Sequence, residues 1–279
     1  MSIAESLRAR GLAPKKKLGQ NFLVDAHAAR VIAEAATTPE GGTVVEIGAG
    51  LGALTRPLLG RAAHVTAIEF DRDLVPILRE DLAAEIAAAR LDLIEGDAAG
   101  VDWAEKLAGG SRPHVVAGNL PYLITGKLIE KAVGLAASID RAVFMVQAEV
   151  ADRLAAPPDG EAYGALSVFV QAAFEVKRIL TVKGGAFHPR PEVDSAVVLL
   201  VPHRPLRAEE TPAFRAAVKA AFGARRKTLR NAWKNLYGWS REELDERARE
   251  AGIDLGARGE TLAVEDFARI AKLASEPLC

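Results

Sequence analysis

The sequence is poor in cysteine and in long apolar runs. One of its 279 residues is a cysteine, Cys279, so the chain alone forms neither an intrachain disulfide nor a multi-cysteine metal site. The longest weakly polar stretch, residues 162–174, is too short for a membrane span and contains Gln171. No basic segment followed by an apolar core opens the chain, so we expect no secretory signal. These absences favour a cytoplasmic enzyme with no metal and no membrane contact.

The sequence also has no excess of charge of one sign. Lys and Arg number 36 and Asp and Glu number 37, so the formal net charge of −1 gives no support to nucleic-acid binding. The basic residues nevertheless crowd the N-terminus and a later predicted helix. Such clusters can follow a phosphate backbone even on a neutral protein, and the alternative for either cluster is an ordinary solvated face. The residues predicted to contact RNA are Lys15, Lys16, Lys17, Arg225, Arg226, Lys227 and Arg230.

The central feature of the chain is a β-branched run that ends in alternating glycines. Residues 44–52 read Val-Val-Glu-Ile-Gly-Ala-Gly-Leu-Gly. Such a run is typical of a buried parallel strand, and glycine lets the backbone turn sharply and approach a ligand because it has no Cβ. The apolar segment that follows, with Pro57 near its start, is predicted to be helical. Strand, glycine turn and helix begin a nucleotide-binding α/β sheet, although ordinary tight turns share the pattern.

Two further predicted strands end in carboxylates. Residues 64–69 end in Glu69 and residues 91–97 in Asp97, and Glu69 follows the first glycine by about twenty residues, the spacing of a ribose-hydroxyl acceptor. A dinucleotide carries a pyrophosphate, which the charge of Glu46 inside the glycine motif is expected to repel. S-adenosylmethionine instead offers a ribose diol, an amino group and a sulfonium cation. The acids therefore favour S-adenosylmethionine as the ligand.

The rest of the chain predicts two domains. Strands and helices alternate up to residue 203, which argues for a mostly parallel sheet with helices on both faces. Beyond it the pattern is helical. We therefore expect an α/β methyltransferase domain at 1–203, in which 1–20 form a mobile basic arm, and a helical RNA-binding domain at 204–279. The predicted helices include 26–36 capped by Asp25, 72–89 capped by Asp71, 211–235, one that begins at the capping box Ser240–Glu243, and 264–274.

A chemically distinctive motif, Asn119-Leu120-Pro121-Tyr122, follows the fourth predicted strand, where open α/β sheets hold substrates. The amino nitrogen of adenine is a poor nucleophile because its lone pair is delocalised. The carbonyl of Asn119, with a main-chain carbonyl beside it, can accept both amino hydrogens and aim that lone pair at a methyl group. Pro121 fixes the backbone and brings no competing N–H. Tyr122 offers a face for stacking the base, and Phe187 is expected to cover the opposite face.

The sequence resembles the KsgA family, the small-subunit ribosomal RNA adenine N6-dimethyltransferases. The matching segments occur in the family's order along nearly the whole chain. The glycine turn carries Ala49 where many members have proline. The segments are Lys17–Leu23, Glu46–Gly52, Asn119–Tyr122, Tyr163–Ser167, Phe187–Val197 and Arg225–Asn231.

The resemblance implies a Rossmann-like class I S-adenosylmethionine-dependent methyltransferase fold. It also implies two methyl transfers to each of two adjacent adenosines in the 3′-terminal hairpin loop of 16S-type rRNA, with the small ribosomal subunit as partner and the enzyme as a cytoplasmic monomer. By motif position, the catalytic segment is Asn119, Leu120, Pro121 and Tyr122 with Phe187. The residues implied to contact S-adenosylmethionine are Asn21, Leu23, Gly48, Glu69, Asp97 and Asn119.

Three other functions remain open at this point. The macrolide-resistance methyltransferases, which modify an adenine of large-subunit RNA, share the glycine turn and the aromatic motif. The long match at 191–197 and the Arg-Arg-Lys helix favour the small-subunit enzymes instead. A non-catalytic RNA-binding assembly or transcription factor could keep the fold, but the intact Asn119–Tyr122 motif argues against lost catalysis. An NAD-dependent oxidoreductase is the most distant alternative.

Overall fold

The computed structural model describes residues 3–224 and 226–274. Contacts along the chain divide it into two compact units. The first consists of residues up to 151 together with 176–202, and the second of residues 152–175 together with those from 203 onward. Each unit has a hydrophobic core of its own.

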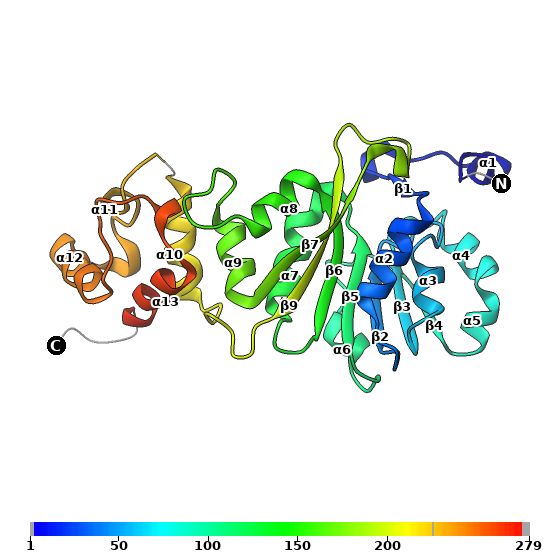
Figure 1. The fold of residues 1–279 in the computed structure, drawn as a ribbon, viewed down its shortest axis with the longest axis horizontal. Helices are drawn as coiled ribbons and strands as arrows, with labels where there is room; N and C mark the ends of the chain where they lie inside the picture. The colour runs from blue at the N-terminus through cyan, green and yellow to red at the C-terminus, as the bar shows by residue number, and fades with distance from the viewer. Residues whose placement is uncertain (1–2, 225, 275–279) are drawn as a thin grey trace. The chain divides into compact units, whose positions relative to one another are not determined.

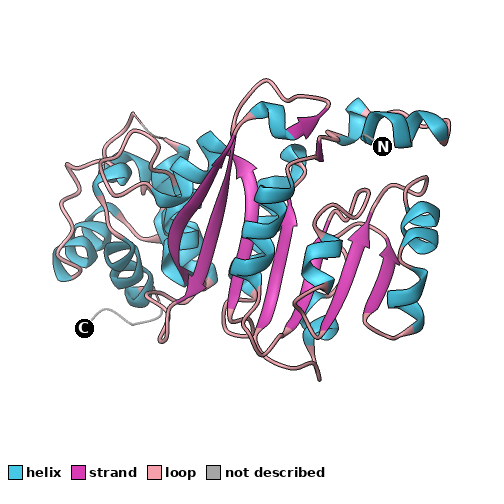
Figure 2. Cartoon of the chain, turned by 45° about the vertical axis from the view of Figure 1, so that its right-hand side comes forward, coloured by secondary structure: helices cyan, strands magenta, loops and turns pink. Residues whose placement is uncertain are grey.

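The first unit is built on one large sheet (Figure 2). The sheet has seven strands: β2 (Thr43–Ile47), β3 (His64–Glu69), β4 (Leu91–Glu95), β5 (His114–Asn119), β6 (Arg141–Gln147), β7 (Phe174–Val182) and β9 (Ser195–Pro202). Their order is β4-β3-β2-β5-β6-β9-β7. The pairs from β4 to β6 are parallel, whereas β9 runs antiparallel to β6. The predicted α/β class with a mostly parallel sheet is therefore confirmed.

The order of the strands creates a switch point in the middle of the sheet. β2 pairs with β3 on one side and with β5 on the other. The chain therefore builds the sheet in one direction through β4 and then returns to continue it in the other. Parallel sheets of this kind hold ligands outside the carboxyl ends of the strands at such a point.

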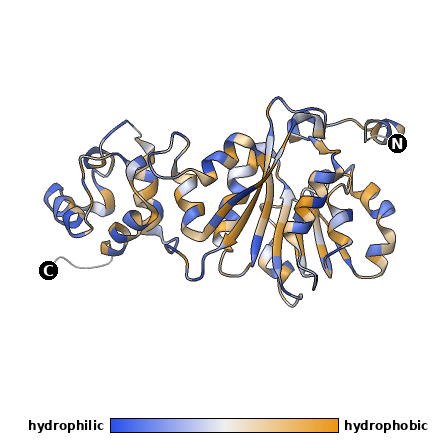
Figure 3. Ribbon diagram, viewed as in Figure 1, coloured by the Kyte–Doolittle hydropathy of each residue, from blue (hydrophilic) through white to orange (hydrophobic). Residues whose placement is uncertain are grey.

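Helices of the first unit pack against this sheet (Figure 1). Asp25 caps α2 as predicted, because its Oδ1 accepts the N–H groups of His27 at 2.7 Å and Ala28 at 3.2 Å. Ile32 of α2 and Leu58 of α3 are buried in the same apolar cluster as Val44 of β2. Figure 3 shows the strands as largely apolar. The helices are α1 (Ile3–Ala9), α2 (Ala26–Ala36), α3 (Thr55–Leu59), α4 (Val75–Asp81), α5 (Ala83–Ala87), α6 (Trp103–Leu107) and α7 (Thr125–Gly134), and α8 (Ala148–Ala155) begins in this unit and ends in the second.

The N-terminal segment is not the mobile arm that we expected. Its described part contains α1 and a 3-10 turn at Lys16–Leu18. Leu7 is 2% exposed and shares an apolar cluster with Phe22, Leu74 and Ile77. The sequence did not reveal this docking because the apolar residues of the segment are widely spaced among charges.

The second unit is helical and larger than predicted. Its helices are α9 (Ala165–Ala173), α10 (Pro212–Gly223), α11 (Leu229–Ala232), α12 (Arg241–Glu250) and α13 (Val264–Leu273). The predicted continuous domain at 1–203 is wrong in one respect, since residues 152–175 belong to the second unit. The reason is that Val168 and Phe169 of α9 pack in one cluster with Phe214 and Phe267. Most residues of α12 are charged, as its largely hydrophilic colour shows (Figure 3), and Leu244 and Ala248 turn its apolar side into the core of this unit.

Two long predicted helices are broken in the structure. The helix predicted at 72–89 is divided into α4 and α5 at Leu82, and the carboxylate of Asp71 accepts the N–H of Asp73 in the turn before them. The helix predicted at 211–235 ends at Gly223, and a separate short helix begins at Leu229. The helix after Ser240 begins with the predicted capping box. Within 3–224 and 226–274, no helix is long and apolar enough to cross a membrane.

Phe169→Ala tests the placement of α9. The ring is 3% exposed and lies edge to face with Phe214 at 6.2 Å between centroids, so its truncation should lower the free energy of unfolding of the second unit by about 3–5 kcal/mol. In a Trp103→Phe background, the remaining tryptophans, Trp233 and Trp239, report that unit in urea unfolding.

The matched control is Phe144→Ala in β6, whose ring is fully buried in the first unit. In a background where Trp103 is the one remaining tryptophan, its fluorescence reports urea unfolding of the first unit. Phe144→Ala should lower the midpoint of that transition, and Phe169→Ala should lower it less. The reverse ranking would assign α9 to the first unit.

Candidate functional site

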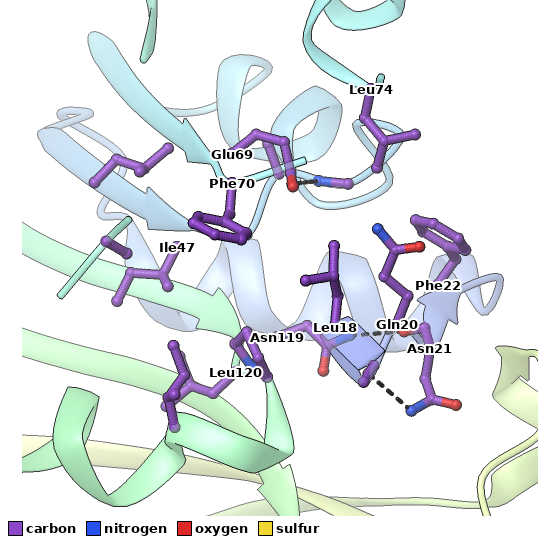
Figure 4. A pocket seen from close by; sticks show the side chains of 18 of the residues that line it. Leu18, Gln20, Asn21, Phe22, Ile47, Glu69, Phe70, Leu74, Asn119 and Leu120 are labelled. Atoms are coloured by element: carbon purple, nitrogen blue, oxygen red, sulfur yellow. Dashed lines mark hydrogen bonds between the residues drawn. The ribbon is translucent and has the colours of Figure 1, made fainter. Parts of the chain in front are cut away.

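The carboxyl ends of β2, β3, β4 and β5 surround a cavity of about 290 Å³ (Figure 4). The cavity lies at the switch point between β2 and β5, where the fold predicts a ligand site. Its walls are the glycine turn, the end of β3, residues 96–98 after β4, residues 119–124 after β5, and residues 17–23 of the N-terminal segment. The structure therefore brings together the residues implied to contact S-adenosylmethionine and the Asn119–Tyr122 segment, but not Phe187.

The glycine turn brings β2 and β5 close together. Gly48 has a φ of +73°, a conformation that side chains with a Cβ rarely adopt. On the facing strand, a Cβ at Gly118 would lie 2.5 Å from the carbonyl oxygen of Ile47. Glycine at these two positions lets the backbone of Asn119 stand directly beside the turn.

Glu69 ends β3 inside the cavity wall and is 6% exposed. Its Oε2 accepts the N–H of Gly50 at 2.7 Å and its Oε1 accepts the N–H of Asp71 at 2.7 Å. Burial raises the pKa of this carboxyl, while the two N–H donors oppose the rise. A carboxylate has about four lone-pair sites, so Glu69 can still accept hydrogen bonds from ligand hydroxyls.

Asp97 stands just after β4 and also lines the cavity. Asp97 is exposed, and its Oδ1 accepts the N–H of Ala99 at 2.9 Å. The loop therefore folds around its own carboxylate and presents it at the cavity. This position fits the predicted acceptor for an amino group, which stays a prediction.

Glu46 does not do what its place in the glycine motif led us to expect. It is fully buried in β2, it is not one of the residues that line the cavity, and neither carboxylate oxygen has a hydrogen-bond partner in the described part of the chain. Burial raises its pKa to about 8; the nearby hydroxyl of Thr55 opposes this rise and the charge of Glu69 adds to it. Glu46 is therefore mostly protonated at neutral pH, and the argument that its charge repels a phosphate is wrong.

Asn119 is held by the N-terminal segment. Its Nδ2 donates to the main-chain carbonyl of Asn21 at 3.1 Å, as Figure 4 shows. Because a carbonyl can only accept, the atom that faces it must be the amide nitrogen, which leaves Oδ1 as the acceptor for a substrate. Asn21 is fixed in turn, since its Nδ2 donates to the carbonyl of Gly19 at 3.2 Å.

Tyr122 begins a 3-10 turn at Tyr122–Ile124 and is anchored through its hydroxyl. The hydroxyl shares a hydrogen bond of 3.0 Å with Oγ of Ser195, which is fully buried at the start of β9. Partial burial raises the pKa of Tyr122. The sequence had given this hydroxyl no task, and the structure shows that it orients the ring.

Phe187 is not one of the residues that line the cavity. It belongs to the short strand β8 (Phe187–His188), where it pairs with Leu23 of β1 (Phe22–Leu23). The ring is 4% exposed in the core of the first unit and does not line the cavity. The ring therefore packs in the core in this structure, and its predicted place over a base opposite Tyr122 stays a prediction.

Two of the apolar residues of the cavity wall that the sequence missed are exposed. Phe70 and Leu123 line the cavity although they are 60% and 74% exposed. Each directly follows a residue that we had singled out, Glu69 or Tyr122, and this adjacency was the available signal. An apolar side chain left in contact with water at a cavity indicates a surface for a flat, weakly polar ligand.

The predicted RNA contacts of the N-terminal segment do not all face solvent. The ammonium of Lys15 pairs with Asp71 and, at 2.6 Å, with Asp73. Gln20 also donates to Asp71, at 2.6 Å. Burial alone would raise the pKa of Asp71, but these donors bring it below its usual value. Lys15 thus fixes the segment to the turn after β3, and its predicted contact with RNA stays a prediction.

The other predicted RNA contacts differ in exposure. Lys16 and Lys17 are exposed in the first unit, and Arg226 and Lys227 are exposed in the second. Arg230 pairs with Asp245. Arg225 lies outside the described residues. No group of three or more His, Cys, Asp or Glu side chains in the described chain is arranged to hold a metal ion.

The raised pKa of Glu46 predicts a pH-dependent stability. The pKa of this carboxyl is about 8 in the folded protein against an ordinary 4.5, so the folded state holds the extra proton between these values and loses stability as the pH rises through them. The free energy of unfolding of Glu46→Gln, measured with urea, should equal that of the wild type near pH 5 and exceed it at pH 8.

Glu34→Gln on the exposed face of α2 serves as the control and should follow the wild type at every pH. If the Glu46→Gln and wild-type curves stay parallel between pH 5 and pH 8, Glu46 is already charged in the folded protein.

Comparison with known proteins agrees with the motifs. Residues 11–276 match the model of the family described as ribosomal RNA adenine dimethylase. The protein called ribosomal RNA small subunit methyltransferase A in Moorella thermoacetica is 46% identical over 275 residues, covering 95% of this chain and 94% of that one. Its counterpart in Geobacter metallireducens is 42% identical over 271 residues, covering 95% and 97%.

Two solved structures share the fold. A dimethyladenosine transferase from Plasmodium falciparum superposes with a TM-score of 0.77 at 23% identity, over 89% of this chain and 95% of that one. The 23S rRNA methyltransferase ErmE superposes with a TM-score of 0.68 at 26% identity, over 92% and 100%. The fold is thus the Rossmann-like class I methyltransferase fold. By its family match and its identity to these relatives, the chain belongs to the ribosomal RNA adenine dimethylase family.

Proposed function

We propose that this protein transfers methyl groups from S-adenosylmethionine to N6 of two adjacent adenosines in the 3′-terminal hairpin loop of small-subunit rRNA, giving N6,N6-dimethyladenosine during small-subunit biogenesis. The observation that carries the proposal is the amide of Asn119, which Asn21 holds with its oxygen available at an acid-lined cavity. The names of the relatives, small subunit methyltransferase A, support the choice of subunit. With ribosomal precursors as substrate, we place the enzyme in the cytoplasm as a monomer.

The cavity suits S-adenosylmethionine. Glu69 has lone pairs left for the ribose hydroxyls, and Asp97 presents a carboxylate for the adenine amino group. Gly48, Asn21 and Leu23 complete the wall near Asn119. When bound, the sulfonium supplies an electrophilic methyl group.

The chain's own residues then prepare the nucleophile. Oδ1 of Asn119, with a main-chain carbonyl of the Asn119–Tyr122 turn, accepts the hydrogens of the target amino group and draws its lone pair out of the ring. Because Asn21 fixes the amide in advance, little reorganisation is needed as charge develops. The anchored ring of Tyr122 stacks on a base extruded from the loop, a contact worth about 1–3 kcal/mol.

We further propose that the exposed basic residues follow the RNA backbone. Lys17 lines the cavity in the first unit and Lys16 precedes it in the chain, and Arg226 and Lys227 provide charge in the helical unit. Phosphate contacts of this kind position an RNA without reading its sequence. Lys15 and Arg230 are left out of this set because carboxylates already pair with them.

A large-subunit adenine is the second candidate substrate. The likeness to ErmE favours it, but the 26% identity to ErmE is well below the 46% identity to the Moorella protein. The substrate assay below separates the two.

Asn119→Ala tests the mechanism. Tritiated S-adenosylmethionine is supplied in parallel reactions with immature small subunits and with large-subunit RNA, and nucleoside analysis should show N6,N6-dimethyladenosine in the small subunits with the wild type. In single turnover at saturating RNA, Asn119→Ala should be slower by roughly 10²–10³-fold, as for the loss of one preorganised polar group, with nearly unchanged RNA affinity. Asn231→Ala, in the second unit, is the control that should keep the wild-type rate. Label in large-subunit RNA alone would refute the substrate, and a fast Asn119→Ala enzyme would refute the mechanism.

Tyr122→Phe and Ser195→Ala test the anchored ring. Each removes one side of the same 3.0 Å hydrogen bond, which is worth about 0.5–1.5 kcal/mol, so each should slow single-turnover methylation by less than about tenfold. The double variant should be no slower than either single variant, whereas Tyr122→Ala, which loses the stacking face, should be much slower. Losses that multiply in the double variant would show that the two hydroxyls act separately.

A further inference from the structure

Lys131 is a half-buried lysine that has no role in the chemistry proposed above. It lies in the last turn of α7, and its Nζ donates to the main-chain carbonyls of Ala98 at 3.2 Å, Ala99 at 3.0 Å and Val101. An ammonium has three N–H donors and no acceptor, so a ring of three carbonyls satisfies it. The indole ring of Trp103 lies under the same nitrogen, 4.7 Å from it to the ring centroid, and adds a cation–π contact.

These contacts are all made to the loop that carries Asp97. The loop begins after β4, and its residues 96–98 line the cavity. Its internal bonds are local: Gly100 N–H donates to the carbonyl of Asp97 at 2.8 Å, and Ala99 N–H donates to the Asp97 carboxylate. The carbonyls of Ala98, Ala99 and Val101 take no part in these local bonds and accept from Lys131 instead. The carbonyl of Ala98 also accepts from Nε1 of Trp103 at 2.9 Å. Lys131 is thus the cationic side chain that ties the loop to a helix.

The position of α7 gives this tie a consequence. α7 directly follows the Asn119–Tyr122 segment, since Thr125 begins the helix and its hydroxyl donates to the carbonyl of Pro121 at 2.9 Å. The loop with Asp97 and the segment with Asn119 are therefore fixed to the two ends of one helix. Desolvation lowers the pKa of Lys131, while the charges of Asp102 and Asp97 oppose that fall.

We propose that Lys131 is a positioning residue for cofactor recognition, holding the Asp97 loop so that the carboxylate meets the amino group of adenine. The inference rests on the proposed function in one respect, the use of S-adenosylmethionine. Lys131 itself touches no ligand. It acts through the backbone of the loop and so determines how well Asp97 distinguishes an amino group from other substituents.

The experiment measures binding of two ligands by calorimetry: S-adenosylmethionine and its deaminated analogue, in which oxygen replaces the adenine amino group. The wild type should prefer S-adenosylmethionine. Lys131→Met keeps the length of the side chain and removes the donors, and it should weaken S-adenosylmethionine about tenfold while the analogue binds as before. Lys131→Gln keeps two N–H donors and should be intermediate. In an Asp97→Ala background, Lys131→Met should have no further effect.

Lys127→Met is the matched control, because Lys127 lies one turn earlier on the same helix and is exposed. It should leave both affinities unchanged. Wild-type affinity for S-adenosylmethionine in Lys131→Met would overturn the inference, and so would an equal loss for both ligands or losses that multiply with Asp97→Ala. If Lys131→Met does not fold, a Lys131→Gln protein with the full wild-type preference would overturn it as well. A wild type that binds neither ligand would instead refute the proposed cofactor.

Discussion

The site depends on the close approach of β2 and β5 at their carboxyl ends. β2 is flanked by β3 and β5. The connections that follow β2 and β5 therefore run to opposite sides of the sheet, and the cavity lies between them. The approach is possible because Gly118 has no Cβ, which would stand 2.5 Å from the carbonyl oxygen of Ile47. It places Asn119 beside the glycine turn at Gly48. Everything chemical in the protein is arranged around that contact.

Burial of charge shapes the walls of this cavity. Glu69 stays a useful acceptor because two backbone N–H groups meet its carboxylate. Glu46, one strand away and without a hydrogen-bond partner among the described residues, is held mostly neutral instead. The same sheet therefore carries one carboxyl that lines the cavity and one that does not. The difference follows from the donors around each group, since an unpaired buried charge is costly.

The N-terminal segment completes the site from the other side. Lys15 and Gln20 fix it to Asp71, just beyond Glu69, and the carbonyl of Asn21 fixes the amide of Asn119. The segment therefore joins the end of β3 to the end of β5 and closes one wall of the cavity. The N-terminal segment, which looks like a charged tail in the sequence, thus sets the orientation of the Asn119 amide.

The sequence by itself determined the fold class, most strand positions and the acids and amide of the site, because β-branched runs, glycines and strand-end carboxylates are local signals. β3, for example, has the predicted bounds, His64–Glu69. Only the tertiary structure decided which side chains are desolvated and which partners they meet. It buried Phe187, neutralised Glu46, paired Lys15 with Asp71 and moved residues 152–175 into the second unit. Each of these outcomes depends on contacts between residues far apart in the chain, and no local pattern encodes them.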